Sequence, residues 1–391
     1  MHADAAKGLH YLDNAATTFP KPESVLQTAV KFCASACVNP GRSTFDLAIE
    51  AEDMLRQART KLTRLFGGTD PNRLVFGYNA TDGLNLVIFG MLRRGGHVVS
   101  TRLEHNSVLR PIAHCVDDFG AQATLVPFDG HGYVDPDDVR RAIRPDTKLV
   151  VVDHASNVIG TVQPVREIGA ICREREVPLC IDAAQTGGMV PIDMQAMMVD
   201  IVAFTGHKSL LGPMGIGGLC VGPDIEIEHS RAGGTGVNSA RRRHLEEYPY
   251  RLEFGTPNMM GIAGLASGVD FIEQRGGVAA VYEREMALAR ILWEGLRETD
   301  GVTLYCADSL AARTPVFSFN IAGFDPAEAG ARLDVDFNVA CRTGLQCAPL
   351  VHETIGTSPA GTVRFSLGPF TTEADVRAGV AAVRELAAER R

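Results

Sequence analysis

The sequence lacks the features that mark several large classes of protein. No apolar run approaches the roughly 18 residues of a membrane-spanning helix, and the N-terminal stretch MHADAAKGLHYLDNAATT has no charged leader followed by an apolar segment. Basic residues are in the minority, with 38 Lys and Arg against 47 Asp and Glu. Because phosphate binding needs clustered positive charge, this balance argues against a nucleic-acid partner. We therefore expect neither membrane insertion nor nucleic-acid binding.

Cysteine is also limited, and its pattern excludes a disulfide framework. The nine cysteines are odd in number and scattered along the chain. Cys33 and Cys37 have helical spacing, but no His or Cys partners lie near them, so we expect a packed helix and no metal site. Free thiols fit a reducing cytoplasm, which is the predicted location.

The length of 391 residues predicts two domains. From residue 74 to 222, apolar Val/Ile/Leu runs alternate with helix-like stretches, which predicts a mainly parallel, doubly wound α/β sheet covered on both faces. After residue 264 the pattern changes to a long helix over 278–298, several short strands and a final helix, whose start Thr372 and Asp375 are placed to cap. We expect a large domain over 17–263 and a smaller α+β domain made of 1–16 and 264–391.

Polar residues stand where several predicted strands end. Asp182 follows the apolar run VPLCI, Lys208 follows IVAF, and His105 and Asn157 follow two further strands. Ligands of open parallel sheets bind at this edge. A partly buried Lys suits a Schiff-base role because burial lowers the pKa of its amine, and a nearby Asp can keep a pyridine nitrogen protonated. Thr81 opens a helix, where a phosphate can meet backbone N–H groups.

The motifs resemble those of a known family. The sequence contains, in the family's order and over nearly the whole chain, YLDNAATTFPKP, LEHNSVLRP, HASNVIGTVQPV, CIDAAQTGG, FTGHKSLLGPMGIGGL, EFGTPNMMG and RTGLQCAP. It resembles the class V aminotransferases and, among them, the cysteine desulfurases with a short catalytic loop. This resemblance implies a fold-type I homodimer with its active site at the subunit interface and pyridoxal 5′-phosphate (PLP) as cofactor.

The resemblance also implies roles for individual residues. Lys208 matches the lysine bonded to the cofactor and Cys347 the nucleophile that receives sulfur. The residues matching other cofactor contacts are Asp182 at the pyridine nitrogen, Gln185 at the ring hydroxyl, His105 stacked on the ring, Thr81, Thr205 and His207 at the phosphate, and Thr256 at the phosphate of the neighbouring subunit. Asn157 and Arg364 match residues that hold the substrate carboxylate. Arg342 belongs to the same motif as Cys347 and either binds substrate or braces the loop.

The implied reaction converts L-cysteine to L-alanine and leaves a persulfide on Cys347 for an acceptor protein or small thiol, in iron–sulfur cluster assembly or thiolation. The alternatives are a selenocysteine lyase acting on L-selenocysteine, another class V aminotransferase or lyase, and a catalytically idle scaffold. Leu345 and Gln346 depart from the family, where imidazole groups often precede the cysteine. Cys341 is either buried structure or a thiol that pairs with Cys347.

Overall fold

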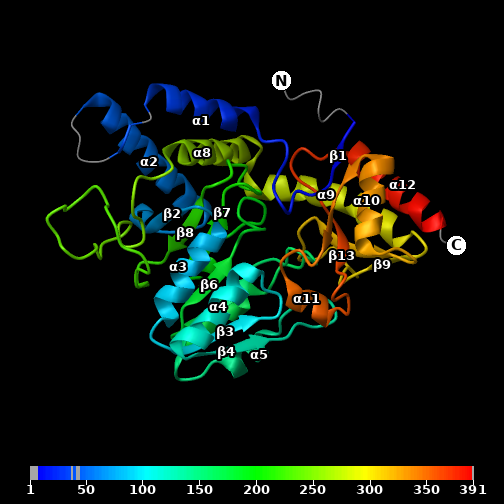
Figure 1. Ribbon diagram of the computed structural model, residues 1–391, viewed down its shortest axis with the longest axis horizontal. Helices are drawn as coiled ribbons and strands as arrows, with labels where there is room; N and C mark the ends of the chain where they lie inside the picture. Colours follow the sequence, from blue (N-terminus) through cyan, green and yellow to red (C-terminus); the bar gives the residue numbers. More distant parts are fainter. Residues whose placement is uncertain (1–7, 37, 41–44, 390–391) are drawn as a thin grey trace.

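The computed structural model describes residues 8–36, 38–40 and 45–389, and a seven-stranded sheet forms the centre of this part of the chain. The strand order is β2-β8-β7-β6-β5-β3-β4, with helices on both faces (Figure 1). The strands are β2 Leu74–Gly77, β3 Gly96–Thr101, β4 Ala121–Val126, β5 Thr147–Asp153, β6 Leu179–Asp182, β7 Ile201–Thr205 and β8 Gly217–Val221. The pairs are parallel except for the two that β8 makes. The predicted doubly wound, mainly parallel sheet is confirmed.

Alternate residues of these strands face two different hydrophobic cores. Val150 and Val152 of β5 belong to one core, whereas Leu149 and Val151 belong to a second core. The helices around this sheet are α1 Glu23–Ser35, α2 Asp46–Leu65, α3 Ala80–Leu92, α4 Asn106–Phe119, α5 Pro136–Ala142, α6 Val165–Glu174, α7 Met194–Met197 and α8 Met259–Gln274, with a 3₁₀ turn at Pro71–Arg73. Burial on both faces explains why the strand sequences are continuously apolar.

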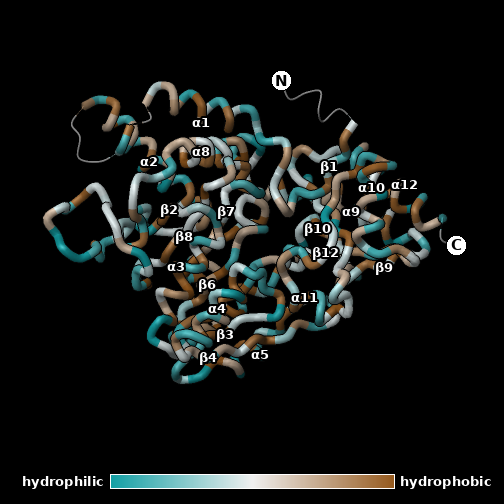
Figure 2. The backbone as a smooth tube through the Cα atoms, viewed as in Figure 1, coloured by the Kyte–Doolittle hydropathy of each residue, from teal (hydrophilic) through white to brown (hydrophobic). Residues whose placement is uncertain are grey.

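The loop between β8 and α8 carries the basic cluster 241–243 and is mostly hydrophilic (Figure 2). Arg241 is exposed and donates hydrogen bonds to the carboxylate of Glu247. The cluster is therefore exposed to solvent, and the charge of Arg241 is paired within the same loop. No helix among the described residues has the length and apolarity to cross a membrane.

A second, four-stranded sheet with order β12-β13-β10-β9 lies beside the first. Its antiparallel strands are β9 Val302–Leu304, β10 Val316–Ile321, β12 Arg342–Gly344 and β13 Thr362–Ser366, and α9 Gly277–Arg297, α10 Pro326–Phe337, α11 Pro349–Thr354 and α12 Glu373–Glu389 accompany them. The N-terminal β1 (His10–Tyr11) pairs with β11 (Val339–Ala340), and Leu12 joins the core of this part. The start of α12 has the predicted cap, since the Asp375 N–H donates to the Thr372 hydroxyl.

The packing of helix α8 indicates where the boundary between the two domains lies. Its residues Leu265, Val269 and Ile272 pack in the core of the seven-stranded sheet, and the helix lies against α1 and α2. We propose that the large domain extends through α8 to Gln274, past the expected boundary at residue 263, and that α9 begins the small domain.

The long helix α9 contains a buried carboxyl group, Glu285, whose two oxygens have no hydrogen-bond partner among the described residues. Burial raises its pKa from 4.5 to about 8, against the opposing charge of Arg284. The folded state keeps a proton that the unfolded state releases between these values, so stability falls as pH rises through this window. We expect Glu285→Gln to remove this fall and to raise the free energy of unfolding at pH 7 by about 3 kcal/mol.

Urea unfolding at pH 5, 7 and 8 measures this effect. Glu283→Gln is the matched control, because Glu283 is exposed on the same helix, and its pH dependence should equal that of the wild type. If the free energy of unfolding depends on pH in the same way in wild type and Glu285→Gln, the Glu285 carboxyl does not cause the loss of stability at higher pH.

Candidate active site

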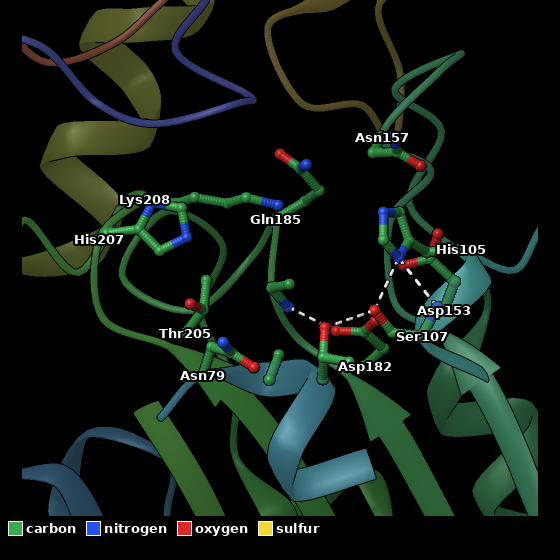
Figure 3. A pocket seen from close by; sticks show the side chains of 13 residues that line it. Asn79, His105, Ser107, Asp153, Asn157, Asp182, Gln185, Thr205, His207 and Lys208 are labelled. Carbon is green, nitrogen blue, oxygen red and sulfur yellow. Dashed lines mark hydrogen bonds between the residues drawn. The ribbon is translucent and has the colours of Figure 1, made fainter. Parts of the chain in front are cut away.

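A cavity of about 250 Å³ opens at the carboxyl ends of β5, β6 and β7, the edge at which open parallel sheets bind ligands. Figure 3 shows Lys208 and His207 on one side, His105 and Asn157 on the other, and Asp182 below them. The predicted site residues that line the cavity are Thr81, His105, Asn157, Asp182, Gln185, Thr205, His207 and Lys208. It also takes in Asn79, Ser107 and Asp153, which sequence reasoning missed.

Lys208 reaches the cavity from the turn that follows β7. Burial lowers the pKa of its amine, and the positive charge of Arg364 acts in the same direction, while Asp182 opposes both. A lower pKa raises the share of unprotonated amine, which is the nucleophilic form. The position and surroundings of Lys208 therefore suit covalent bonding to a carbonyl group.

Asp182 ends β6, and its Oδ1 accepts the backbone N–H of Ala184 at 2.9 Å. Asp153 ends β5 directly beside it in register, and Glu104 Oε1 accepts the Asp153 N–H at 3.0 Å. Burial raises the pKa of all three carboxyl groups, to about 8 for Glu104. Because Lys208 lowers the pKa of Asp182, positive charge in the cavity favours its ionised form. Like Asp182, Asp153 is an acidic residue at the end of an apolar strand, so the same pattern in the sequence could have identified it.

His105 caps the start of α4 with its imidazole. Its Nδ1 accepts the Ser107 N–H at 3.0 Å and lies 2.8 Å from the Ser107 hydroxyl, which is 2.7 Å from the Thr81 hydroxyl. Burial, followed by the charge of Lys208, lowers the pKa of His105 to about 4. The ring is therefore neutral at physiological pH and carries its proton on Nε2, since Nδ1 acts as an acceptor.

The start of α3 and the end of β7 form another wall of the cavity. Asn79 caps α3, its side chain accepting the Asp82 N–H at 2.9 Å, and Thr81 lies in the first turn. Thr205 is buried, and its hydroxyl has no hydrogen-bond partner among the described residues. His207 Nδ1 lies 3.1 Å from the Thr17 hydroxyl, and burial lowers its pKa to about 4. A helix N-terminus with spare hydroxyl groups can bind an anion such as phosphate.

Two arginines of the small sheet share the carboxylate of Asp13. Arg364, which is buried on β13, donates to Asp13 Oδ1 at 2.8 Å and to the Asn157 carbonyl at 3.0 Å. Arg342 is exposed and donates to Asp13 Oδ2 at 2.8 Å. The Nε of Arg364 has no partner among the described residues. Arg364 thus has an N–H group free to donate to a substrate carboxylate. Arg342 instead binds Asp13, a contact that suits a residue that braces the Cys347 loop.

Cys347 lies in the loop between β12 and α11 and is exposed. Its carbonyl accepts the Asn106 N–H at 2.7 Å, and Asn106 directly follows His105 of the cavity. Cys347 is also among the groups whose charge acts on the pKa of Lys208. The loop that carries this thiol therefore lies against the start of α4, next to His105 of the cavity.

Two other residues singled out in the sequence, Cys341 and Thr256, do not line the cavity. Cys341 is partly buried, its Sγ facing Gly330 of α10, and burial raises the pKa of its thiol to about 12. This environment supports a packing role over a resolving thiol. Thr256 is exposed and does not line the cavity of its own chain. Cys37 lies outside the described residues, and no group of three or more metal-ligating side chains is found within them.

Comparison with known proteins defines the class of this fold and site. The class-V aminotransferase family model matches residues 10–378, and the chain belongs to this family. A relative from Methanothermobacter thermautotrophicus, named a probable cysteine desulfurase, is 31% identical, with 94% of this chain and 92% of the relative aligned.

Solved structures agree with the sequence relatives. The apo cysteine desulfurase from Thermococcus onnurineus NA1 superposes with a TM-score of 0.90 at 30% identity, covering 100% of this chain and 98% of that one. The cysteine desulfurase CsdA from Escherichia coli gives a TM-score of 0.87 at 26% identity, covering 98% and 96%. The similarity therefore extends over both domains and the loop that carries Cys347.

Proposed function

We propose that this protein is a PLP-dependent cysteine desulfurase, which converts L-cysteine to L-alanine and takes the sulfur as a persulfide on Cys347. The proposal rests on one observation: the loop that carries Cys347 packs beside the cavity that contains Lys208 and Asp182. A partly buried lysine and a buried aspartate come from the large domain, and the Cys347 loop of the small domain hydrogen-bonds to the residue after His105. The names of the relatives and structural neighbours point to the same reaction.

The residues of the cavity fit PLP in charge and in hydrogen-bonding capacity. The free hydroxyl of Thr205 and the first turn of α3 with Thr81 are suited to the phosphate. The buried carboxyl of Asp182 gains a compensating partner from a protonated pyridine nitrogen. His105 and Gln185 line the space between these ends, as ring stacking and contact with the ring hydroxyl require.

When bound, PLP withdraws electrons from the α-carbon of the substrate amino acid. Lys208 would hold the cofactor, and its amine would move the α-proton of the substrate. Arg364 holds the substrate carboxylate, with Asn157 beside it. Cys347 attacks the substrate sulfur as a thiolate. The three-carbon remainder takes a proton and leaves as alanine.

We further propose a homodimer in which Thr256 reaches the phosphate in the neighbouring subunit, because Thr256 is exposed and does not line the cavity of its own chain. The persulfide then requires an acceptor protein or small thiol, in iron–sulfur cluster assembly or thiolation. The reducing cytoplasm suits an exposed reactive thiol.

Product analysis tests the proposed function. With L-cysteine and a reducing thiol, the purified PLP-loaded protein should release alanine and sulfide in equal amounts. The amount of any transamination product should be smaller than the amount of alanine. Selenide and alanine from L-selenocysteine, with no turnover of L-cysteine, would instead identify a selenocysteine lyase. No product from either amino acid would refute the proposal.

A further inference from the structure

The turn that carries Cys347 has an uncommon backbone. Gln346 and Cys347 have φ angles of 41° and 60°, and Gly344 just before them has 89°. Residues other than glycine rarely adopt the left-handed region, and two in succession need support from their surroundings. The contacts of Gln346 show where this support comes from.

The large domain holds the backbone of the turn. Asn157 Nδ2 donates to the Gln346 carbonyl at 2.7 Å, and the Asn106 N–H donates to the Cys347 carbonyl at 2.7 Å. The Asn157 carbonyl in turn accepts Arg364 Nη1 at 3.0 Å. The amide of Asn157 must present its NH₂ group to Gln346, because its oxygen would repel a carbonyl. One residue thus joins the arginine proposed to bind substrate to the cysteine loop.

The small domain holds the side chain of Gln346. Its Nε2 donates to the Thr362 carbonyl of β13 at 2.9 Å, and its Oε1 accepts His352 Nε2 of α11 at 2.9 Å. His352 is fully buried, and its Nδ1 accepts the Thr357 hydroxyl at 2.8 Å. Burial lowers the pKa of His352 to about 4, so the ring is neutral and its Nε2–H remains a donor at physiological pH.

These contacts require a side chain at position 346 that both donates and accepts a hydrogen bond, as an amide does. The Thr362 carbonyl needs a donor, and His352 Nε2–H needs an acceptor. An ionised glutamate supplies no donor, and an aliphatic side chain supplies neither group. Gln346 meets both demands at once, which gives a physical reason for glutamine at the position before Cys347.

We propose that Gln346, held by His352, is a positioning residue that fixes the Cys347 thiol for attack on the substrate sulfur. This inference rests on the proposed function. In the step concerned, the bond between Cys347 Sγ and the substrate sulfur forms as the substrate C–S bond breaks, and its electron pair passes to the substrate carbon. Gln346 therefore controls sulfur transfer and has little influence on cofactor or cysteine binding.

Single-turnover measurements on the PLP-loaded protein test this role. Gln346→Leu should slow persulfide formation on Cys347 by about 10- to 100-fold, because small displacements of a reacting group are costly. The KM for L-cysteine and the visible spectrum of the cofactor should stay close to wild type. Leu345→Ala is the matched control, a change of side chain at the neighbouring position, and should retain the wild-type rate. If Gln346→Leu does not fold, Gln346→Met gives the same test with a side chain of equal length.

A double-mutant cycle separates positioning from a general structural effect. If Gln346 and His352 act together, adding His352→Leu to Gln346→Leu should slow sulfur transfer no further. A wild-type rate in Gln346→Leu, multiplicative defects in the double variant, or a parallel loss of cofactor and cysteine binding would overturn the proposal. Failure of the proposed function is seen separately, as alanine formation at the wild-type rate by Cys347→Ala.

Discussion

Replacing Lys208 with alanine is expected to reduce alanine formation from L-cysteine by roughly 10²–10⁴-fold, the loss typical of a removed proton-transfer group. Lys208 is the amine at the centre of the cavity, and its lowered pKa suits both covalent bonding and proton transfer. Neither role passes readily to His105 or His207, because an imidazole forms no imine and burial lowers the pKa of both rings to about 4, which makes them weak bases. The variant should also lose covalent attachment of PLP, while Asp182 and the first turn of α3 still bind the cofactor reversibly.

The measurement combines activity with borohydride reduction and peptide mass spectrometry. In the wild type, reduction should fix the cofactor on the peptide that contains Lys208. Lys148→Ala is the control, because Lys148 is exposed near the amino end of β5, at the opposite edge of the sheet, and it should behave as wild type. A Lys208→Ala variant that keeps both reduced label and activity would exclude Lys208 as the cofactor lysine.

The second large effect is expected at the thiol. Cys347→Ala should lower sulfur release from L-cysteine by roughly 10³-fold or more, the scale seen when an enzyme loses its nucleophile. Cys347 is exposed, in a loop whose backbone hydrogen-bonds to Asn106, the residue after His105. The other described cysteines are buried, partly buried, or, like Cys33, on helix α1. The cofactor spectrum should be unchanged, because Cys347 holds no part of the PLP site.

Cys341→Ala is the matched control for this variant. Its thiol lies six residues away, with a pKa raised to about 12 by burial, so it is a poor nucleophile and a poor partner for a disulfide. We expect Cys341→Ala to retain activity close to wild type. Equal losses in the two variants would point to structural damage in the loop and its neighbours.

Much of the fold followed from local patterns in the sequence. Apolar runs such as KLVVV and VPLCI indicated strands buried on both faces, and the structure places them in β5 and β6. The Thr372 and Asp375 cap marked the beginning of α12 within one residue. The packing of α8 against the core of the seven-stranded sheet was not visible in the sequence, because the apolar pattern of a helix does not indicate which core the helix joins.

The sequence predicted a site at the carboxyl ends of the strands, where polar residues follow the apolar runs. The cavity lies at this edge of the sheet. Contacts between distant segments were not predictable, because no local pattern reports them. Asp13 bridges Arg342 and Arg364 from the N-terminal segment, and the amide of Asn157 is engaged by the turn at Gln346. Gln346 drew attention as a departure from the family, yet its partner His352 emerged from tertiary packing alone.

The most direct test of the account is mass spectrometry of the PLP-loaded protein after brief exposure to L-cysteine without reductant. We predict one added sulfur atom on the peptide that contains Cys347, together with one equivalent of alanine. Alanine formed with no added sulfur on that peptide, or sulfur added to a different cysteine, would contradict the assignment of Cys347 as the sulfur acceptor.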